Sequence, residues 1–184
     1  MGTRGVTMVI QKERAEVAQY GQWDHYPSGQ GVTTLNILRE VIMKSKESFE
    51  DFKDKVSKLE FITQHSFDAK LEEVGIDSKK QFITFEESDR FKEKYPYLHR
   101  DCGAEVLKHV ADGSAKELKN DFDYAQTGFD CEWCYVVNLD KETFEVYENN
   151  YMPGNLKGSF DLNNLPTEEE FLNHFKTEEE EEEN

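Results

Sequence analysis

Two β-hairpin patterns lie near opposite ends of the chain, on either side of a helical middle. The clearer pattern is late, where the apolar and β-branched segments Glu132–Leu139 and Thr143–Glu148 flank the polar residues 140–142. An earlier hairpin is predicted from Thr3–Ile10 and Ala15–Tyr20. Hairpins separated in this way are not typical of a doubly wound parallel sheet. We therefore expect an α+β fold in which the N-terminal and C-terminal hairpins form one antiparallel sheet, packed on one face against the helical middle section.

The middle of the chain has apolar residues at helical spacing. The expected helices cover Val32–Met43, Ser48–Ile62, Phe67–Val74, Glu86–Lys94 and Gly103–Ala111. A short strand at Ser159–Leu162 and a final helix follow the late hairpin. Thr167 and Glu170 have the spacing of a capping box at the start of that helix.

Length and charge limit the organisation and the partners of the chain. With 184 residues, the chain fits one domain, expected at residues 1–176, followed by a disordered acidic tail at 177–184. The net charge of −17 argues against direct binding to nucleic acid or anionic membranes, because phosphate contacts need Lys and Arg. No apolar run approaches the length of a membrane span. Three cysteines without a secretory signal favour reduced thiols and a cytoplasmic location.

The segment Tyr20–Gly31 (YGQWDHYPSGQG) concentrates aromatic, polar and glycine residues between a strand and a helix. We expect a loop whose glycines permit close backbone approach, with the amides of residues 32–35 opening the helix as an anion site. Arg4 on the neighbouring strand would add a guanidinium, and the aromatic rings could stack on a planar group. The alternative is an ordinary connector whose aromatics plug the edge of the core. The candidate ligand-binding residues are Arg4, Tyr20, Gln22, Trp23, Asp24, His25, Tyr26, Gly29, Gln30 and Gly31.

Catalysis by the same segment is a second hypothesis, in which His25 or Asp24 acts as a general base in a small hydrolase. Thr3 invites comparison with N-terminal-nucleophile hydrolases, but removal of Met1 would expose Gly2 rather than Thr3. Catalytic residues therefore stay unassigned.

The cysteines offer a third hypothesis. Cys131 and Cys134 have C-x-x-C spacing, and Cys102 with His99 could complete a zinc site. Residues three apart on a strand face opposite sides of the sheet, however. We therefore expect buried or edge thiols, no metal and no cofactor.

The opening MGTRGVTMVI, the loop GQWDHYPSGQG, the segment HRDCGAEVL and the late hairpin resemble a group of uncharacterised small proteins of Gram-positive bacteria and their phages and prophages. The shared features are a Thr-Arg-Gly strand and a Gln-Trp-Asp-x-Tyr-Pro-x-Gly-x-Gly loop. The resemblance brings no established activity. It implies that binding or antagonism of a host component is more plausible than housekeeping catalysis.

The leading hypothesis is a non-enzymatic binding protein that holds a small polar or phosphorylated ligand, such as a nucleotide, or antagonises a host component. The alternatives are a hydrolase that uses the 20–31 loop, and an acidic interaction module or nucleic-acid mimic that contacts a basic host protein.

Overall fold

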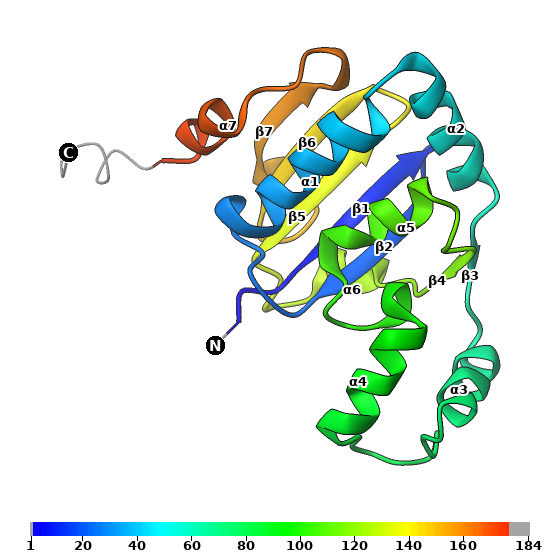
Figure 1. The fold of residues 1–184 in the computed structure, drawn as a ribbon. Coiled ribbons are helices and arrows are strands. Elements are labelled where there is room, and N and C mark those ends of the chain that lie inside the picture. Colours follow the sequence, from blue (N-terminus) through cyan, green and yellow to red (C-terminus); the bar gives the residue numbers. More distant parts are fainter. Residues whose placement is uncertain (1, 177–184) are drawn as a thin grey trace.

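The computed structural model describes residues 2–176 of the chain, so the expected tail at 177–184 lies outside the described residues. A mixed sheet runs through the centre of the molecule (Figure 1). Its five strands, in spatial order, are β2 (Arg14–Gly21), β1 (Gly5–Gln11), β5 (Trp133–Asn138), β6 (Thr143–Glu148) and β7 (Leu156–Asp161). The two predicted hairpins are therefore confirmed, and they belong to one sheet.

The junction between the hairpins is parallel, whereas every other pairing in the sheet is antiparallel. The register runs from Gly5 opposite Trp133 to Ile10 opposite Asn138. The starts of β1 and β5 therefore lie at one end of the sheet. Gly21, the last residue of β2, pairs with Gly5 and lies at this end too.

Helices cover both faces of the sheet, not one face as expected. They are α1 (Val32–Ile37), α2 (Lys46–Ser57), α3 (Gln64–Glu73), α4 (Phe85–Lys94), α5 (Val106–Ala111), α6 (Phe122–Thr127) and α7 (Glu168–His174). Figure 1 shows α1, α2 and α5 on the same side of the sheet.

The central strands are apolar on both faces, which explains the second layer. On β1, Val9 joins the core under α1, α2 and α5, while Val6 and Met8 join a second core with Ala125 of α6. Successive side chains of a strand point to opposite faces, so a strand without a polar face needs cover on both sides. The alternation on β5 is the same, with Tyr135 in the first core and Cys134 in the second.

The predicted long helix at Ser48–Ile62 ends earlier, because the chain after α2 turns into β3 (Glu60–Phe61). This strand pairs in parallel with β4 (Glu117–Leu118), outside the main sheet. Beyond it, α3 and α4 lie together away from the main sheet (Figure 1). Their contact is a third core that includes Ile76, Phe91 and Leu98.

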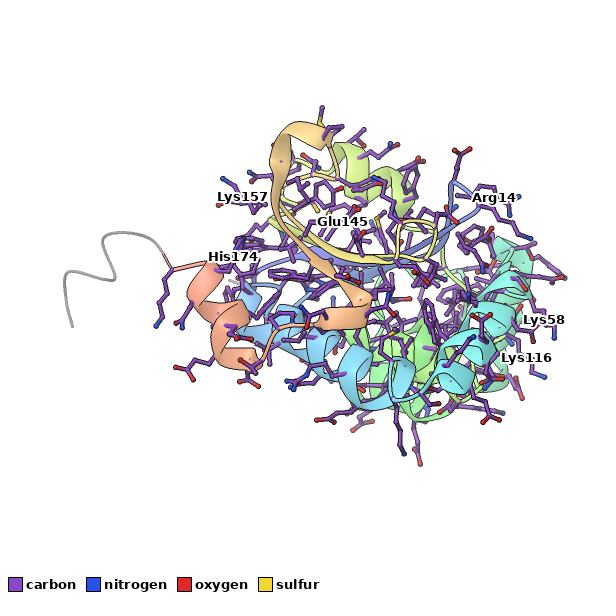
Figure 2. All side chains as sticks on the ribbon, turned by 90° about the horizontal axis from the view of Figure 1, so that it is seen from above. Arg14, Lys58, Lys116, Glu145, Lys157 and His174 are labelled. Atoms are coloured by element: carbon purple, nitrogen blue, oxygen red, sulfur yellow. The ribbon has the colours of Figure 1, made fainter. Side chains whose placement is uncertain are left out.

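The last helix begins as predicted. The Thr167 hydroxyl accepts from the Glu170 amide at 3.2 Å, and the Glu170 carboxylate accepts from the Thr167 amide at 2.8 Å. At its other end, Nε2 of His174 lies 2.9 Å from the Lys157 carbonyl oxygen, which joins α7 to β7 (Figure 2). Within residues 2–176, no helix has the length and apolarity to cross a membrane.

Candidate functional site

The helix start predicted at Val32 is wrong, because the helix begins five residues earlier. Pro27–Gly31 forms a π-helical turn that runs directly into α1. Proline at the first position suits a helix start, since it has no amide hydrogen to leave unpaired. The Val32 amide is bonded to carbonyls of Gly29 and Pro27, so it is not free to hold an anion. The fold thus shortens the predicted loop to residues 22–26.

His25 is completely buried in a cradle made by two glycines. A Cβ atom placed on Gly21 would lie 2.0 Å from His25 Cε1, and one placed on Gly5 would lie 2.4 Å from His25 Cδ2. The strand pair that closes this end of the sheet therefore accommodates the imidazole only because neither residue has a side chain.

The imidazole of His25 is held neutral. Burial lowers the pKa of His25 to about 4. Nδ1 lies 3.3 Å from the Trp23 carbonyl oxygen and is the nitrogen that can donate to it, while Nε2 has no hydrogen-bond partner among the described residues. The His25 backbone is fixed as well, because its carbonyl accepts from the Tyr135 hydroxyl at 2.5 Å. Enclosed in this way, His25 cannot reach a substrate outside the domain.

The other polar groups of the segment are also used within the fold. The side-chain oxygen of Gln30 accepts from the Ala104 amide at 2.8 Å, and the Gln30 amide donates to the Asp24 carbonyl at 2.7 Å. A Cβ on Gly29 would lie 2.1 Å from the same Asp24 oxygen. Gly31 packs on the ring of Tyr135. Glycine is required at position 29, and a side chain at position 31 would press on the ring of Tyr135.

Arg4 lies at the same end of the sheet, but its guanidinium is paired with a carboxylate. It forms a salt bridge with Asp130, whose other oxygen accepts from the Tyr124 hydroxyl at 3.0 Å. The Tyr20 ring packs edge-on against Tyr124, and the Tyr20 hydroxyl donates to Gln22 at 2.7 Å. The structure thus places two polar groups side by side, Arg4–Asp130–Tyr124 and Tyr20–Gln22, joined by the contact between the two tyrosine rings. The sequence did not indicate Tyr124 or Asp130.

Three candidate residues face solvent at the tip of the segment. The exposed fractions are 47% for Trp23 and 43% for Tyr26, and Asp24 between them is exposed with a left-handed backbone (φ 57°). Phe129, which is 98% exposed, precedes the Asp130 that binds Arg4 and so belongs to the same end of the sheet. Sequence reasoning missed Phe129, because a single aromatic in a turn carries no pattern.

The prediction that Cys131 and Cys134 face opposite sides of the sheet is wrong. Their Sγ atoms lie 3.5 Å apart, because β5 begins at Trp133 and Cys131 belongs to the preceding turn. Both thiols are buried, and the hydrogen bond with Cys131 together with burial raises the pKa of Cys134. Among residues 2–176, no group of three or more His, Cys, Asp and Glu side chains is arranged to hold a metal ion.

Comparison with known proteins adds no relative to these observations. No protein-family model, curated protein or solved structure matches the chain. The structure itself defines the class, which is α+β with a mostly antiparallel five-stranded sheet.

Proposed function

We propose that the protein is a non-enzymatic binding protein that recognises a basic protein partner through the tip of its 20–31 segment. The observation that carries the proposal is that Trp23, Asp24 and Tyr26 are exposed, whereas His25 between them is buried. The backbone amide of His25 donates to the Thr3 carbonyl, which fixes the backbone of the tip. Exposed Trp and Tyr side chains are the residues that most often dominate binding energy at protein interfaces. A rigid backbone lowers the entropy lost on binding.

A protein partner fits the side-chain positions better than a phosphorylated ligand does. Arg4, the expected anion receptor, is already neutralised by Asp130. The exposed surface of the tip offers two aromatic rings and one carboxylate instead. The net charge of −17 adds long-range attraction for a basic surface. The resemblance to phage and prophage proteins favours a host protein as that partner, and antagonism of its activity as the outcome.

The hydrolase alternative gains no support from the site. Its general base would be His25, which is buried and neutral, or Asp24, which is exposed and whose carboxylate accepts, among the described residues, only a long hydrogen bond of 3.4 Å from the Tyr26 hydroxyl. A nucleotide stacked on Trp23 or Tyr26 remains the competing binding hypothesis, and it requires Arg4 to exchange Asp130 for a phosphate.

Affinity measurements with matched variants test the proposal. Partners from an extract of a Gram-positive bacterium would be captured on wild-type protein, on Trp23→Ala/Tyr26→Ala, and on Phe82→Ala/Phe85→Ala. The last variant removes two exposed aromatics outside the segment. A captured partner would then be purified and titrated by calorimetry. We expect the tip variant to weaken binding by about 10-fold or more, and affinity to fall as salt rises.

Two results would overturn the proposal. One is equal affinity of the purified partner for wild type and for the tip variant. The other is saturable binding of a nucleotide that is lost in both Arg4→Ala and Trp23→Ala, which would assign the segment to a phosphorylated ligand.

A further inference from the structure

A groove of about 730 Å³ lies outside the 20–31 segment, on the part of the molecule formed by α3 and α4. Phe67 and Leu71 line it from α3, and Phe91 lines it from α4. Leu98 and residues 81–85 also line it. The volume is within the range of sites that enclose small organic molecules, and the walls are mainly apolar, as in such sites.

Three apolar residues of this groove are largely exposed to solvent. The exposed fractions are 82% for Phe82, 88% for Phe85 and 44% for Ile83, all in or beside the connection between α3 and α4. The rest of the protein covers little of Phe82 and Phe85 and about half of Ile83. An apolar molecule in the groove would bury part of this surface, which is favourable by about 25 cal/mol per Å².

The groove also contains an ammonium group without a paired carboxylate. Lys119 lines the groove with its Nζ 4.0 Å from the centre of the Phe67 ring, and it forms no salt bridge with any residue of 2–176. Burial lowers the pKa of Lys119. Asp121 attracts it from beyond ion-pair distance, while the carboxylate of Asp121 accepts from the Tyr20 amide at 2.9 Å. An anion in the groove would therefore meet a partly desolvated cation.

Arg100 also lines the groove and its side chain is 59% exposed, but its Nε already lies 3.6 Å from a carboxylate oxygen of Asp101. The third basic residue, His99, is not available to a ligand. Its Nε2 lies 2.8 Å from the Ser88 hydroxyl, and its Nδ1 accepts from the Asp101 amide at 3.2 Å. Burial also lowers the pKa of His99, which favours the neutral ring. The positive charge of the groove that has no carboxylate partner among residues 2–176 thus comes from Lys119.

We propose that the groove binds a small molecule that combines an apolar chain or ring with one carboxylate. The apolar part would lie against Phe67, Phe82 and Phe85, and the carboxylate would pair with Lys119. Charge complementarity supports this occupant, because Lys119 has no ion-pair partner among residues 2–176 and no carboxylate lines the groove, in a protein with 39 acidic and 22 basic residues. The site is separate from the 20–31 segment, so it does not depend on the function proposed above.

Decanoate and decanol test the proposal directly, since they share the chain and differ in the charge of the head group. Both would be titrated into the full chain in competition with anilinonaphthalene sulfonate, a fluorescent aromatic sulfonate. We expect saturable displacement at one site, with decanoate binding about 10-fold more tightly than decanol.

Matched variants locate the site. Lys119→Gln should reduce the affinity for decanoate about 10-fold and leave decanol unchanged. Lys116→Gln makes the same charge change at an exposed residue outside the groove (Figure 2) and should change neither. Phe82→Ala/Phe85→Ala should weaken both ligands, whereas Phe129→Ala, at the 98% exposed aromatic beside Asp130, should weaken neither. Because all these positions except Lys119 are exposed, unchanged circular dichroism and melting temperature are expected and would be checked for each variant.

The outcomes separate the alternatives. Equal binding of decanoate and decanol, or equal loss in Lys119→Gln and Lys116→Gln, would overturn the assignment of the carboxylate to Lys119. Absence of saturable displacement by either molecule would overturn the groove as a binding site for this class of ligand.

Discussion

The imidazole of His25 occupies the space that a side chain on Gly21 would fill. A Cβ on Gly21 would lie 2.0 Å from Cε1 and 2.9 Å from Nδ1 of the ring, and the backbone of Gly21 pairs with Gly5, the other wall of the cradle. The two glycines and the histidine are therefore one packing unit, although they lie on two strands and a turn. This unit holds the end of β1 and β2 together beneath the exposed tip.

Gly21→Ala should destabilise the fold by about 2 kcal/mol or more, because overpacking a closed site displaces the ring or the strand. Thermal and denaturant unfolding would measure the change. Gly154→Ala is the matched control, since a Cβ there meets no atom within 4 Å, and its cost should stay below about 0.5 kcal/mol.

A double-mutant cycle tests whether His25 is the cause. In the His25→Ala background the added methyl group of Gly21→Ala finds space, so its cost should fall well below its cost in wild type. Additive effects of the two substitutions would contradict the packing unit.

The stability of the protein should depend on pH through His25. Its folded pKa of about 4 is below the ordinary value of 6.5, so the unfolded chain binds the proton more readily. Stability from the neutral ring is complete above pH 6.5 and is lost as the pH falls from 6.5 through about 4, by about 3 kcal/mol in total. Urea unfolding of wild type and His25→Asn across this interval would measure it. Parallel pH profiles of the two proteins would contradict the prediction.

Tyr135→Phe should cost about 1–2 kcal/mol, because it removes the hydroxyl that donates to the buried His25 carbonyl at 2.5 Å. Tyr26→Phe removes a hydroxyl at the surface, 3.4 Å from an Asp24 oxygen, and should cost less than about 0.5 kcal/mol. Equal unfolding midpoints for the two variants would show that the Tyr135 hydrogen bond does not stabilise the segment.

The three thiols should be inert in the folded protein. Cys102, Cys131 and Cys134 are buried, and burial raises the pKa of Cys102 to about 12. Ellman's reagent should titrate three thiols in concentrated guanidinium and react slowly with the native chain. Fast native reaction of Cys131 or Cys134 would point to local opening of the turn before β5.

Local patterns in the sequence predicted most of the fold. The alternation in Thr143–Glu148 and the capping box of Thr167 and Glu170 are properties of neighbouring residues, and both are present in the structure. The parallel pairing of β1 with β5 was not predictable in this way, because it depends on contacts between residues such as Arg4 and Glu132, which are 128 positions apart.

The composition of the 20–31 segment correctly indicated that it is unusual. In the structure, however, many of its groups make contacts within the fold instead of forming the predicted anion site. Residues of the segment contact Gly5, Ala104 and Tyr135, which no local pattern connects to the segment. A glycine that admits a ligand and a glycine that admits a histidine ring have the same sequence signature. Within the segment, Trp23, Asp24, Tyr26 and Ser28 face solvent.

The parallel junction also has a consequence for synthesis. β1 emerges from the ribosome early and can pair at once with β2, but its other edge stays open until residues 133–138 have been made. That edge belongs to an apolar strand, GVTMVIQ, and an open edge of this kind can pair with the same strand of another chain. A nascent chain stalled before β5 is therefore the species most prone to aggregate, and the arrival of the late hairpin protects the early one.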